Sequence, residues 1–259
     1  MIPKIIHQTW KDTEVPEHWA SSPPAWKKHH PGWSYILWTD EMNRQLIAEN
    51  YPWFLETYDS FPHAIQRADA VRYFILYTYG GLYADLDLEP LRSLEPLLEQ
   101  CQAEVYLVGA AHLGGLTNSI MASQKGAGFW RSVFSRLMGY QKLPWYQKVG
   151  KHLGVMFSTG PAMITEVARA HEQTICLLPQ SVLLPCTVCE PYPCEKGGYL
   201  RALEGCSWIR WDTRCYNFVL CHWKDLLIII LLLVVLGGYL WYRYYRRCEA
   251  CFTRCPNIS

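Results

Sequence analysis

The chain has 259 residues, and its 24 Lys and Arg nearly balance its 23 Asp and Glu, so the formal net charge at pH 7 is +1. A charge this close to zero gives no electrostatic basis for binding nucleic acid, which requires a strongly basic surface. The length suits one globular domain of about 220 residues with a short appendage.

The N-terminal part of the chain predicts two strands and two helices. Residues 4–10 (KIIHQTW) predict a first parallel strand, 33–38 (WSYILW) a second strand, and 40–47 and 52–58 two helices, the first with Asp40 as its N-cap. Ligands of open α/β sheets bind at the carboxyl ends of the strands, where the first strand carries four polar or aromatic side chains. These are His7, Gln8, Thr9 and Trp10. Core packing of the indole is the alternative.

The next stretch predicts a helix that ends at a pair of glycines. Asp69 and Arg72 are three residues apart, so they share one face of a helix. Gly80 and Gly81 end that helix, because glycine adopts a left-handed conformation without steric cost.

The sequence LYADLDL follows and predicts a strand by its alternation, with Asp85 and Asp87 on one face and Pro90 ending the pairing. Two like charges side by side repel each other, so they call for a compensating cation. Mn²⁺ or Mg²⁺ suits carboxylate oxygens. A metal that also carries a diphosphate would make this a nucleotide-sugar site, whereas solvated aspartates at a strand end are the plain alternative.

Downstream patterns predict further alternating elements of an α/β fold. These are a short helix at 90–100, a strand at 104–110, a strand or turn at 116–123, helices at 128–138 and 162–170, and short strands at 175–178 and 181–184.

Six of the 11 cysteines lie within residues 186–221, and such an even cluster suits disulfides in a lumenal or extracellular domain. The six are Cys186, Cys189, Cys194, Cys206, Cys215 and Cys221. A zinc site is the alternative, because Cys186 and Cys189 have the spacing of metal ligands. Reduced, inert cysteines are a third reading.

Residues 226–242 form an uncharged apolar run, which at 1.5 Å per residue spans roughly 25 Å and can cross a thin bilayer. Five aromatic residues and three arginines flank its end, as at a membrane interface. They are Tyr239, Trp241, Tyr242, Tyr244, Tyr245, Arg243, Arg246 and Arg247. A buried core helix is the alternative. We expect a domain at 1–223, a transmembrane helix at 224–245, and a tail with Cys and Arg at 246–259.

Two segments, IPKIIHQTW (2–10) and RADAVRYFILYTYGGLYADLDLEPL (67–91), resemble glycosyltransferases that carry a DXD sugar-binding region. The likeness is to the family of the yeast-type α-1,6-mannosyltransferases and the inositol phosphorylceramide mannosyltransferases, and it runs from about residue 2 to about residue 223. The resemblance implies a GT-A fold with a Rossmann-like mixed sheet flanked by helices. It also implies retaining transfer of a sugar from a nucleotide donor, with a divalent metal.

The resemblance also implies roles for individual residues. It assigns the nucleotide base to residues 7–10, the sugar side of the pocket to Asn118, and metal or diphosphate binding to His222. An ordinary turn asparagine and a histidine at the membrane interface are the alternatives. By their chemistry, Asp69 and Arg72 would brace the donor. Asp87 would hold the metal together with Asp85, which alternatively binds ribose or sugar hydroxyls.

We therefore expect a retaining, metal-dependent glycosyltransferase that moves a hexose, first of all mannose from GDP-mannose, to a membrane lipid such as inositol phosphoceramide. A UDP-galactose or UDP-N-acetylglucosamine transferase of the same family is one alternative. A catalytically silent, membrane-anchored sugar-binding protein is another.

The expected membrane orientation rests on the arginines beyond the apolar run. The positive-inside rule puts that tail in the cytosol and the catalytic domain in the Golgi or ER lumen, and the cysteine usage agrees. Met1 leads directly into a strand, so we expect no N-terminal signal peptide. A tail-anchored enzyme that faces the cytosol is one alternative, and a missing upstream anchor is another.

Overall fold

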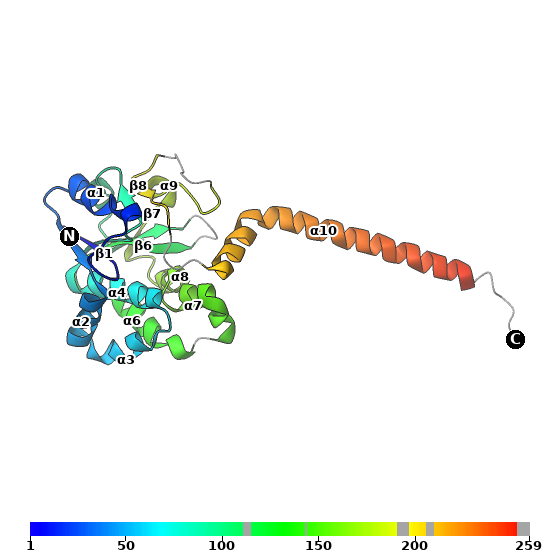
Figure 1. Cartoon of the computed structure of the whole chain (residues 1–259), viewed down its shortest axis with the longest axis horizontal. Coiled ribbons are helices and arrows are strands. Elements are labelled where there is room, and N and C mark those ends of the chain that lie inside the picture. Colours follow the sequence, from blue (N-terminus) through cyan, green and yellow to red (C-terminus); the bar gives the residue numbers. More distant parts are fainter. Residues whose placement is uncertain (111–114, 143, 191–196, 206–209, 253–259) are drawn as a thin grey trace. The chain divides into compact units, whose positions relative to one another are not determined.

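The protein is described by a computed structural model, and its chain divides into two compact units, Met1–Asp212 and Thr213–Ser259. The structure describes residues 1–110, 115–142, 144–190, 197–205 and 210–252. The first unit contains the sheets and the helices that cover them (Figure 1).

A six-stranded mixed sheet runs through the first unit in the order β2-β1-β3-β6-β5-β7. Strands β2, β1 and β3 are parallel, β6 is antiparallel to both of its neighbours, and β7 is parallel to β5. The bounds are β1 (Ile5–Thr9), β2 (Ser34–Trp38), β3 (Gly81–Ala84), β5 (Val105–Gly109), β6 (Leu116–Ser123) and β7 (Ile175–Leu178). A small antiparallel sheet pairs β4 (Leu88–Pro90) with β8 (Leu200–Ala202). The expected mixed α/β sheet is confirmed.

Helices cover both faces of this sheet, with α4 and α6 on one side and α1 and α9 on the other (Figure 1). The α-helices of this unit are α1 (Ser22–His29), α2 (Asp40–Asn50), α3 (Pro52–Ser60), α4 (Ala64–Tyr79), α5 (Glu95–Leu98), α6 (Phe129–Met138), α7 (Gly150–Ser158), α8 (Pro161–Arg169) and α9 (Gln180–Leu183). Short 3-10 turns lie at Glu17–Trp19, Tyr140–Lys142 and Trp145–Lys148. Alternation along β3 divides the core: Tyr83 packs into one cluster, and Leu82 and Ala84 pack into the other.

Helix α4 is the central helix of the fold. Every residue from 69 to 76 is buried, so the burial covers all sides of this segment and includes Asp69 and Arg72. Phe74 stacks on Phe134 of α6 with ring centroids 4.1 Å apart, which fixes α4 against its neighbour. A helix buried on all sides can hold charged residues only where they pair with one another or with other polar groups.

The turn from α4 into β3 depends on the two glycines, as expected. Gly80 and Gly81 have φ values of 68° and 94°. A Cβ on Gly81 would lie 2.4 Å from the carbonyl oxygen of Ile5 in β1. Both the backbone conformation and the close approach of the two strands therefore require glycine at position 81.

The expected strand through both aspartates is wrong. Strand β3 ends at Ala84, where the amide of Asp85 still donates to the carbonyl of Ser119 at 2.7 Å. The chain then turns, and the amide of Leu88 donates back to the carbonyl of Asp85 at 3.0 Å. Pro90 does not end the pairing, because it lies within β4 of the second sheet. Asp85 and Asp87 therefore lie in a turn, where the chain passes from β3 of the large sheet to β4 of the small sheet.

The structure also differs from the sequence predictions at three helices. Thr39, and not Asp40, caps α2, because its hydroxyl accepts from the amide of Met42 at 3.2 Å. Residues 181–184, expected as a strand, lie largely in α9, where the amide of Leu184 donates to the carbonyl of Gln180 at 2.8 Å. The helix expected at 90–100 is shorter, since β4 extends to Pro90 and leaves only α5.

The second unit contains most of the long helix α10 (Trp211–Phe252). The backbone of this helix is non-helical at His222. Its segment Trp211–Arg246 has a mean hydropathy of 2.4 in its most apolar window, none of which is buried. By length and composition it can cross a membrane, as the sequence predicts, and it is the one such helix in the described part of the chain. The expected division at residue 223 stays a prediction, and residues 253–259 of the tail lie outside the described residues.

The cysteines form a different pattern from the expected one. A disulfide joins Cys101 and Cys176, which are 75 residues apart and were not predicted as a pair. Cys186, Cys189 and Cys221 are also disulfide-bonded, which favours the disulfide reading over zinc for these three. Cys215 is an exposed free thiol, so the expectation that all six pair is wrong for it. Cys194 and Cys206 lie outside the described residues.

Replacing Gly81 with alanine should destabilise the first unit far more than the same change at Gly32. Gly32 has a similar φ of 84°, but nothing lies within 4 Å of its added Cβ. The backbone strain of about 1–2 kcal/mol is shared by both variants, whereas the clash with β1 should cost about 1–3 kcal/mol more at Gly81. Denaturant unfolding of both variants measures the difference, and equal losses would contradict the steric argument.

Candidate functional site

A cavity of about 440 Å³ opens where the parallel strands end. Thr9 is the last residue of β1, and Asp85 directly follows β3, so two strand ends contribute to its wall. Helix α4 contributes Arg72. Further lining residues include Trp10, Lys11, Trp19, Asp40, His63, Leu86, Asp87, Lys151 and Arg210. The cavity occupies the place where open α/β sheets bind their ligands.

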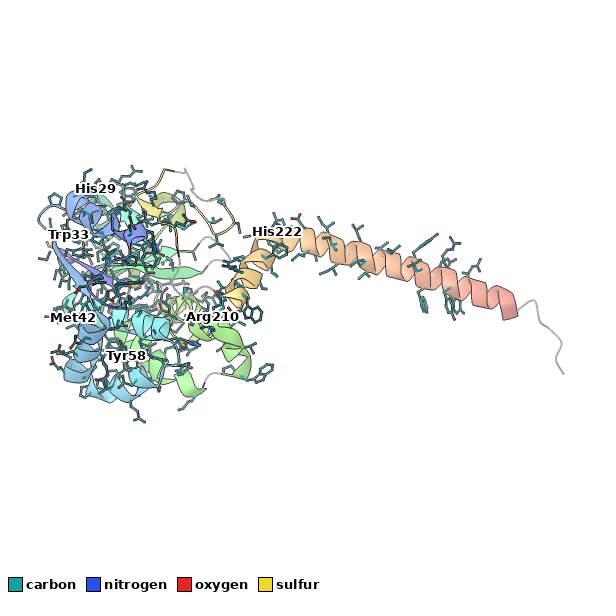
Figure 2. The ribbon with its side chains drawn as sticks, in the orientation of Figure 1. His29, Trp33, Met42, Tyr58, Arg210 and His222 are labelled. Atoms are coloured by element: carbon teal, nitrogen blue, oxygen red, sulfur yellow. A yellow bond between two sulfur atoms is a disulfide. The ribbon has the colours of Figure 1, made fainter. Side chains whose placement is uncertain are left out.

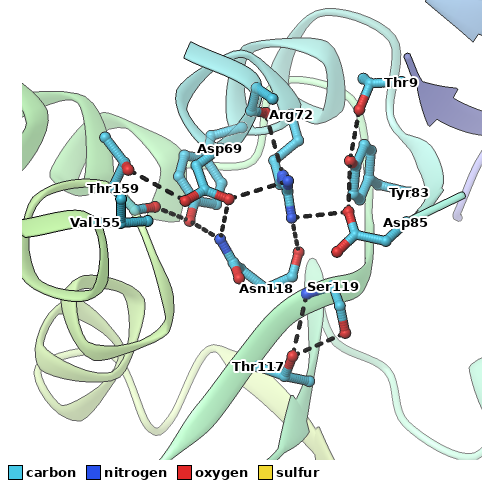
Figure 3. Close-up of polar contacts among 12 residues, drawn as sticks. Thr9, Asp69, Arg72, Tyr83, Asp85, Thr117, Asn118, Ser119, Val155 and Thr159 are labelled. Carbon is cyan, nitrogen blue, oxygen red and sulfur yellow. Dashed lines mark hydrogen bonds and ion pairs between the residues drawn. The ribbon is translucent and has the colours of Figure 1, made fainter. Parts of the chain in front are cut away.

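Arg72 lies at the centre of the polar network beside this cavity (Figure 3). Its Nη2 atom is 3.0 Å from Oδ1 of Asp69, and its Nη1 atom is 3.0 Å from Oδ1 of Asp85. Nη1 also donates to the backbone carbonyl of Asn118 at 2.8 Å, and Nε donates to that of Ala68 at 3.2 Å. One buried guanidinium therefore joins α4, β6 and the acidic turn, using the several donors that only arginine offers.

Asp69 is almost completely buried and accepts hydrogen bonds from two further elements. The Asn118 amide donates to its Oδ1 atom at 3.1 Å, and the Thr159 hydroxyl donates to its Oδ2 atom at 3.2 Å. Burial raises the pKa of Asp69 to about 7, while Arg72, Asn118 and Thr159 act in the opposite direction. This carboxylate is held inside the protein and orients Arg72.

Asp85 is held from the opposite side of the network. The Tyr83 hydroxyl donates to its Oδ1 atom at 2.8 Å and lies 2.9 Å from the hydroxyl of Thr9. Gln8 donates to the backbone carbonyl of Asp85 at 3.1 Å. Burial raises the pKa of Asp85, and Arg72 opposes that shift by favouring the charged form. Its orientation is fixed before any ligand binds.

Asp87 lies two residues further along the turn and is the least compensated carboxylate. It forms no ion pair within the described part of the chain, and it lines the cavity. Burial, and then the negative charge of Asp85, raise the pKa of Asp87 to about 7. Asp69, Asp85 and Asp87 lie at this end of the sheet, where Arg72 pairs with the first two only. The carboxyl groups therefore outnumber the guanidinium, which leaves an excess of negative charge.

The acidic turn fits a divalent cation. Two carboxylate side chains at one cavity wall, with excess negative charge, are the oxygen donors that Mg²⁺ and Mn²⁺ prefer. Among the described residues, no group of three or more His, Cys, Asp and Glu side chains has the arrangement of a metal site. Asp85 and Asp87 would therefore hold a cation together with oxygen atoms from outside this group.

The structure separates the predicted site residues into two sets. Thr9, Trp10, Arg72, Asp85 and Asp87 line the cavity. The others in the first unit lie behind its wall and are buried; they are His7, Gln8, Asp69 and Asn118.

His7 and Gln8 are buried behind the cavity wall and form hydrogen bonds with neighbouring elements. Nε2 of His7 is 2.9 Å from the carbonyl of Gly80, and Nδ1 accepts from the Trp38 indole at 3.0 Å. Burial lowers the pKa of His7 to about 4, so the ring is neutral. Gln8 accepts from the Tyr35 hydroxyl at 2.8 Å. These side chains hold β1 in place, and direct donor contact by either of them stays a prediction.

His222 belongs to the second unit. It is exposed and lies at the non-helical point of α10, and its Nδ1 atom is 3.5 Å from Asp225 (Figure 2). Its assignment as a metal ligand stays a prediction.

Sequence reasoning missed the basic residues of the cavity wall. These are Lys11, His63, Lys151 and Arg210, which come from four separate parts of the chain. Trp19 was also missed as a lining residue; its ring meets that of Trp10 edge to face, with centroids 5.0 Å apart. No local pattern marks them, because only the tertiary fold brings them together.

Residues 16–104 match the family described as "Glycosyltransferase sugar-binding region containing DXD motif", a segment that includes Arg72 and both aspartates of the turn. The family resemblance expected from the sequence is confirmed.

Two fungal proteins illustrate the similarity. The chain is 38% identical over 229 residues to inositol phosphoceramide mannosyltransferase 3 of Schizosaccharomyces pombe, covering 86% of this chain and 60% of that protein. It is 41% identical over 173 residues to mannosyl phosphorylinositol ceramide synthase CSH1 of Saccharomyces cerevisiae, covering 67% of this chain and 44% of that protein. The chain therefore spans about half the length of these relatives.

Among solved structures, the PaToxG glycosyltransferase aligns with a TM-score of 0.49 and 15% sequence identity. The alignment covers 66% of this chain and 70% of that one.

Removing the buried guanidinium of Arg72 should strongly destabilise the protein. Arg72→Met leaves two buried carboxylates without their partner, a situation that costs about 3–5 kcal/mol. The control is Arg44→Met, which removes an exposed pair with Asp59 at 2.8 Å and should cost at most about 1 kcal/mol. Denaturant unfolding measures both. Adding Asp69→Asn to Arg72→Met should recover part of the loss, and no recovery would contradict the proposed charge balance.

Stabilisation by Mn²⁺ should increase with pH around neutrality. The folded protein keeps a proton on Asp87 up to a pKa of about 7, while the unfolded chain releases it near pH 4. Without metal, this group therefore makes folding less favourable as pH rises from about 4 to about 7. Mn²⁺ must displace the same proton, so its apparent affinity should fall up to about tenfold per pH unit below 7.

Thermal unfolding with and without Mn²⁺ between pH 5.5 and 8 measures this linkage. Asp87→Asn should abolish the dependence, whereas Asp59→Asn, at an exposed residue outside the cavity, should retain it. A Mn²⁺ shift that is the same at every pH would exclude Asp87 as the coupled group.

Proposed function

This chain carries, in residues 16–104, the sugar-binding region of the DXD-containing glycosyltransferases, and on that premise we propose that it transfers a hexose to a membrane lipid. The donor proposed is GDP-mannose, and the acceptor is inositol phosphoceramide. The names of the two fungal relatives support this choice, since both describe addition of mannose to inositol phosphoceramide. A GT-A type of fold and retention of configuration belong to the same proposal.

The observation that carries the proposal is the acidic turn in the cavity. Asp85 is oriented by Arg72 and Tyr83, while Asp87 has no ion pair among the described residues. An unbalanced acidic pair costs stability unless a cation compensates it. A protein that only needed a stable core would gain nothing from retaining both charges there.

Asp87 and Asp85 would hold Mn²⁺ or Mg²⁺. When bound, such an ion neutralises negative charge that develops on the leaving diphosphate. Asp85 cannot turn freely toward the sugar, because Arg72 and Tyr83 both hold its Oδ1 atom.

The aromatic pair Trp10 and Trp19 would receive the nucleotide base. Both rings line the cavity at the end of β1, and the Trp19 indole donates to the carbonyl of Glu204 at 3.0 Å. That bond fixes the ring of Trp19, and the edge-to-face contact with Trp10 then limits the motion of the second ring. Flat, immobile rings suit base stacking because little side-chain entropy is lost on binding.

The retaining outcome is consistent with the state of the carboxylates. Asp69 is bound by Arg72, Asn118 and Thr159 inside the wall. Asp85 is bound by Arg72 and Tyr83. Neither is poised as a covalent nucleophile, so we propose reaction on the front face of the donor sugar.

A membrane location would supply the lipid acceptor. Helix α10 is long and apolar enough to cross a bilayer, and aromatic residues and arginines follow its most apolar part. We propose a single span with the first unit in the lumen of the Golgi or ER. The arginines favour a cytosolic tail, and the disulfide Cys101–Cys176 suits an oxidising lumen.

The full chain in detergent, supplied with Mn²⁺ and GDP-mannose, should transfer mannose to inositol phosphoceramide. EDTA should abolish the transfer, and Asp87→Asn should lower it by at least about 10³-fold while leaving the circular dichroism spectrum unchanged. Asp59→Asn should keep full activity, because Asp59 is exposed and does not line the cavity. Radiolabelled product on the lipid is the measurement, with UDP-galactose and UDP-N-acetylglucosamine as competing donors. Full activity in EDTA would contradict the role given to the acidic turn.

The first unit should be protected from added protease in intact microsomes and digested after detergent is added. An epitope at the C-terminus should be accessible in both conditions, since the arginine-containing tail is assigned to the cytosol. Digestion of the first unit without detergent would reverse the proposed orientation.

A further inference from the structure

Part of the cavity wall is basic and is built from residues that the acidic turn does not use. Lys151 lies in the first turn of α7, and Arg210 directly precedes α10. Arg210 is exposed and forms no ion pair within the described part of the chain. The exposed Arg44, by contrast, has a carboxylate partner in Asp59, at 2.8 Å. Arg210 therefore presents to the cavity a guanidinium with no ion pair among the described residues.

A specific contact holds these two cations near each other. The carboxylate of Asp212 accepts a hydrogen bond at 2.8 Å from the amide of His152, in the first turn of α7. Gly150 has a φ of 72°, and a Cβ on it would lie 3.2 Å from Oδ2 of Asp212. Asp212 thus ties the segment that contains Arg210 to the helix end that contains Lys151.

His63, on a third element, lies close enough to Lys151 and Arg210 for their charges to act on it. It lines the same cavity at the start of α4. Burial lowers the pKa of His63, the positive charges of Lys151 and Arg210 lower it further, and the negative charge of Asp212 raises it. The histidine is therefore neutral at pH 7, so Lys151 and Arg210 supply the charge of this part of the wall.

Building on the proposed transferase function, we propose that Arg210, assisted by Lys151, binds the phosphodiester anion of the lipid acceptor. The donor diphosphate would already be compensated by the cation at the acidic turn. The acceptor phosphate carries one negative charge of its own and needs a separate cation. A guanidinium can bind two phosphate oxygens at once, which fixes the orientation of the attached inositol.

Chain connectivity favours the acceptor over the donor as the occupant. Arg210 directly precedes α10, the helix whose apolar run at 226–242 is proposed to cross the bilayer. The acidic turn belongs to the segment between β3 and β4, which is far away in sequence. A phosphodiester at the lipid headgroup is attached to the membrane, so a cation close in sequence to the proposed span is a better candidate for it than the acidic turn.

The test uses the full chain in detergent and the soluble probe glycerophosphoinositol, which has the inositol phosphodiester but no lipid tail. Titration calorimetry in the presence of Mn²⁺ and GDP would measure its binding to wild type, Arg210→Ala, Arg210→Lys and Lys151→Ala. The control is Arg131→Ala, at an exposed arginine on α6 that does not line the cavity. Affinity for GDP with Mn²⁺ would be measured for each variant separately.

We expect Arg210→Ala to weaken binding of the probe about tenfold, corresponding to one charged hydrogen-bond contact. Arg210→Lys should lower the affinity for the probe by an intermediate amount, because lysine keeps the charge but cannot make the bidentate contact. Lys151→Ala should give a smaller loss, and Arg131→Ala none. GDP affinity should stay within twofold of wild type in all four variants.

Two results would overturn the inference. One is equal probe affinity for Arg210→Ala and wild type. The other is a fall in GDP affinity that parallels the loss of probe affinity, which would assign Arg210 to the donor diphosphate. If wild type binds the probe through Arg210 but transfers no mannose to inositol phosphoceramide, the proposed function fails while the phosphodiester site stands.

Discussion

The ion pairs of Arg72 hold the site together. A guanidinium buried between Asp69 and Asp85 allows three carboxylates to lie near one strand end without unfolding it. Buried ion pairs rarely add net stability, because desolvation offsets the attraction between the charges. The arrangement is therefore best understood as a device for orientation: it fixes Asp85 at the cavity wall and leaves Asp87 as the carboxylate with spare negative charge.

That network exists only because α4 and β3 are connected tightly. Gly80 and Gly81 return the chain from the helix into the sheet beside β1, at a distance that admits no Cβ at position 81. Tyr83 then points into the same core as α4, and its hydroxyl reaches both Thr9 and Asp85. The glycine pair thus aligns two strand ends and a helix around one cavity.

Acidic and basic side chains of the cavity wall come from different elements of the structure. The turn after β3 is acidic and suits a metal-bound diphosphate, whereas the wall formed by α7 and the residue before α10 is basic. Separate regions of opposite charge in one cavity can orient two anionic substrates differently, since one is bound through a cation and the other directly. The proposed transfer requires such an arrangement, because donor and acceptor both carry phosphate.

The sequence by itself determined the elements and the acidic half of the site. Hydrophobic periodicity and glycine placement are local signals, so β1, β2, β5 and α4 could be predicted from residues close together in the chain. The spacing of Arg72, Asp85 and Asp87 likewise indicated that they belong to one site, and all three line the cavity. Only the tertiary structure decided that the aspartates lie in a turn between two sheets, that His7 and Gln8 lie behind the wall, and that Cys101 pairs with Cys176. It alone also brought Lys151 and Arg210 to the cavity. These features depend on contacts between residues far apart in the chain, for which a single sequence carries no local pattern.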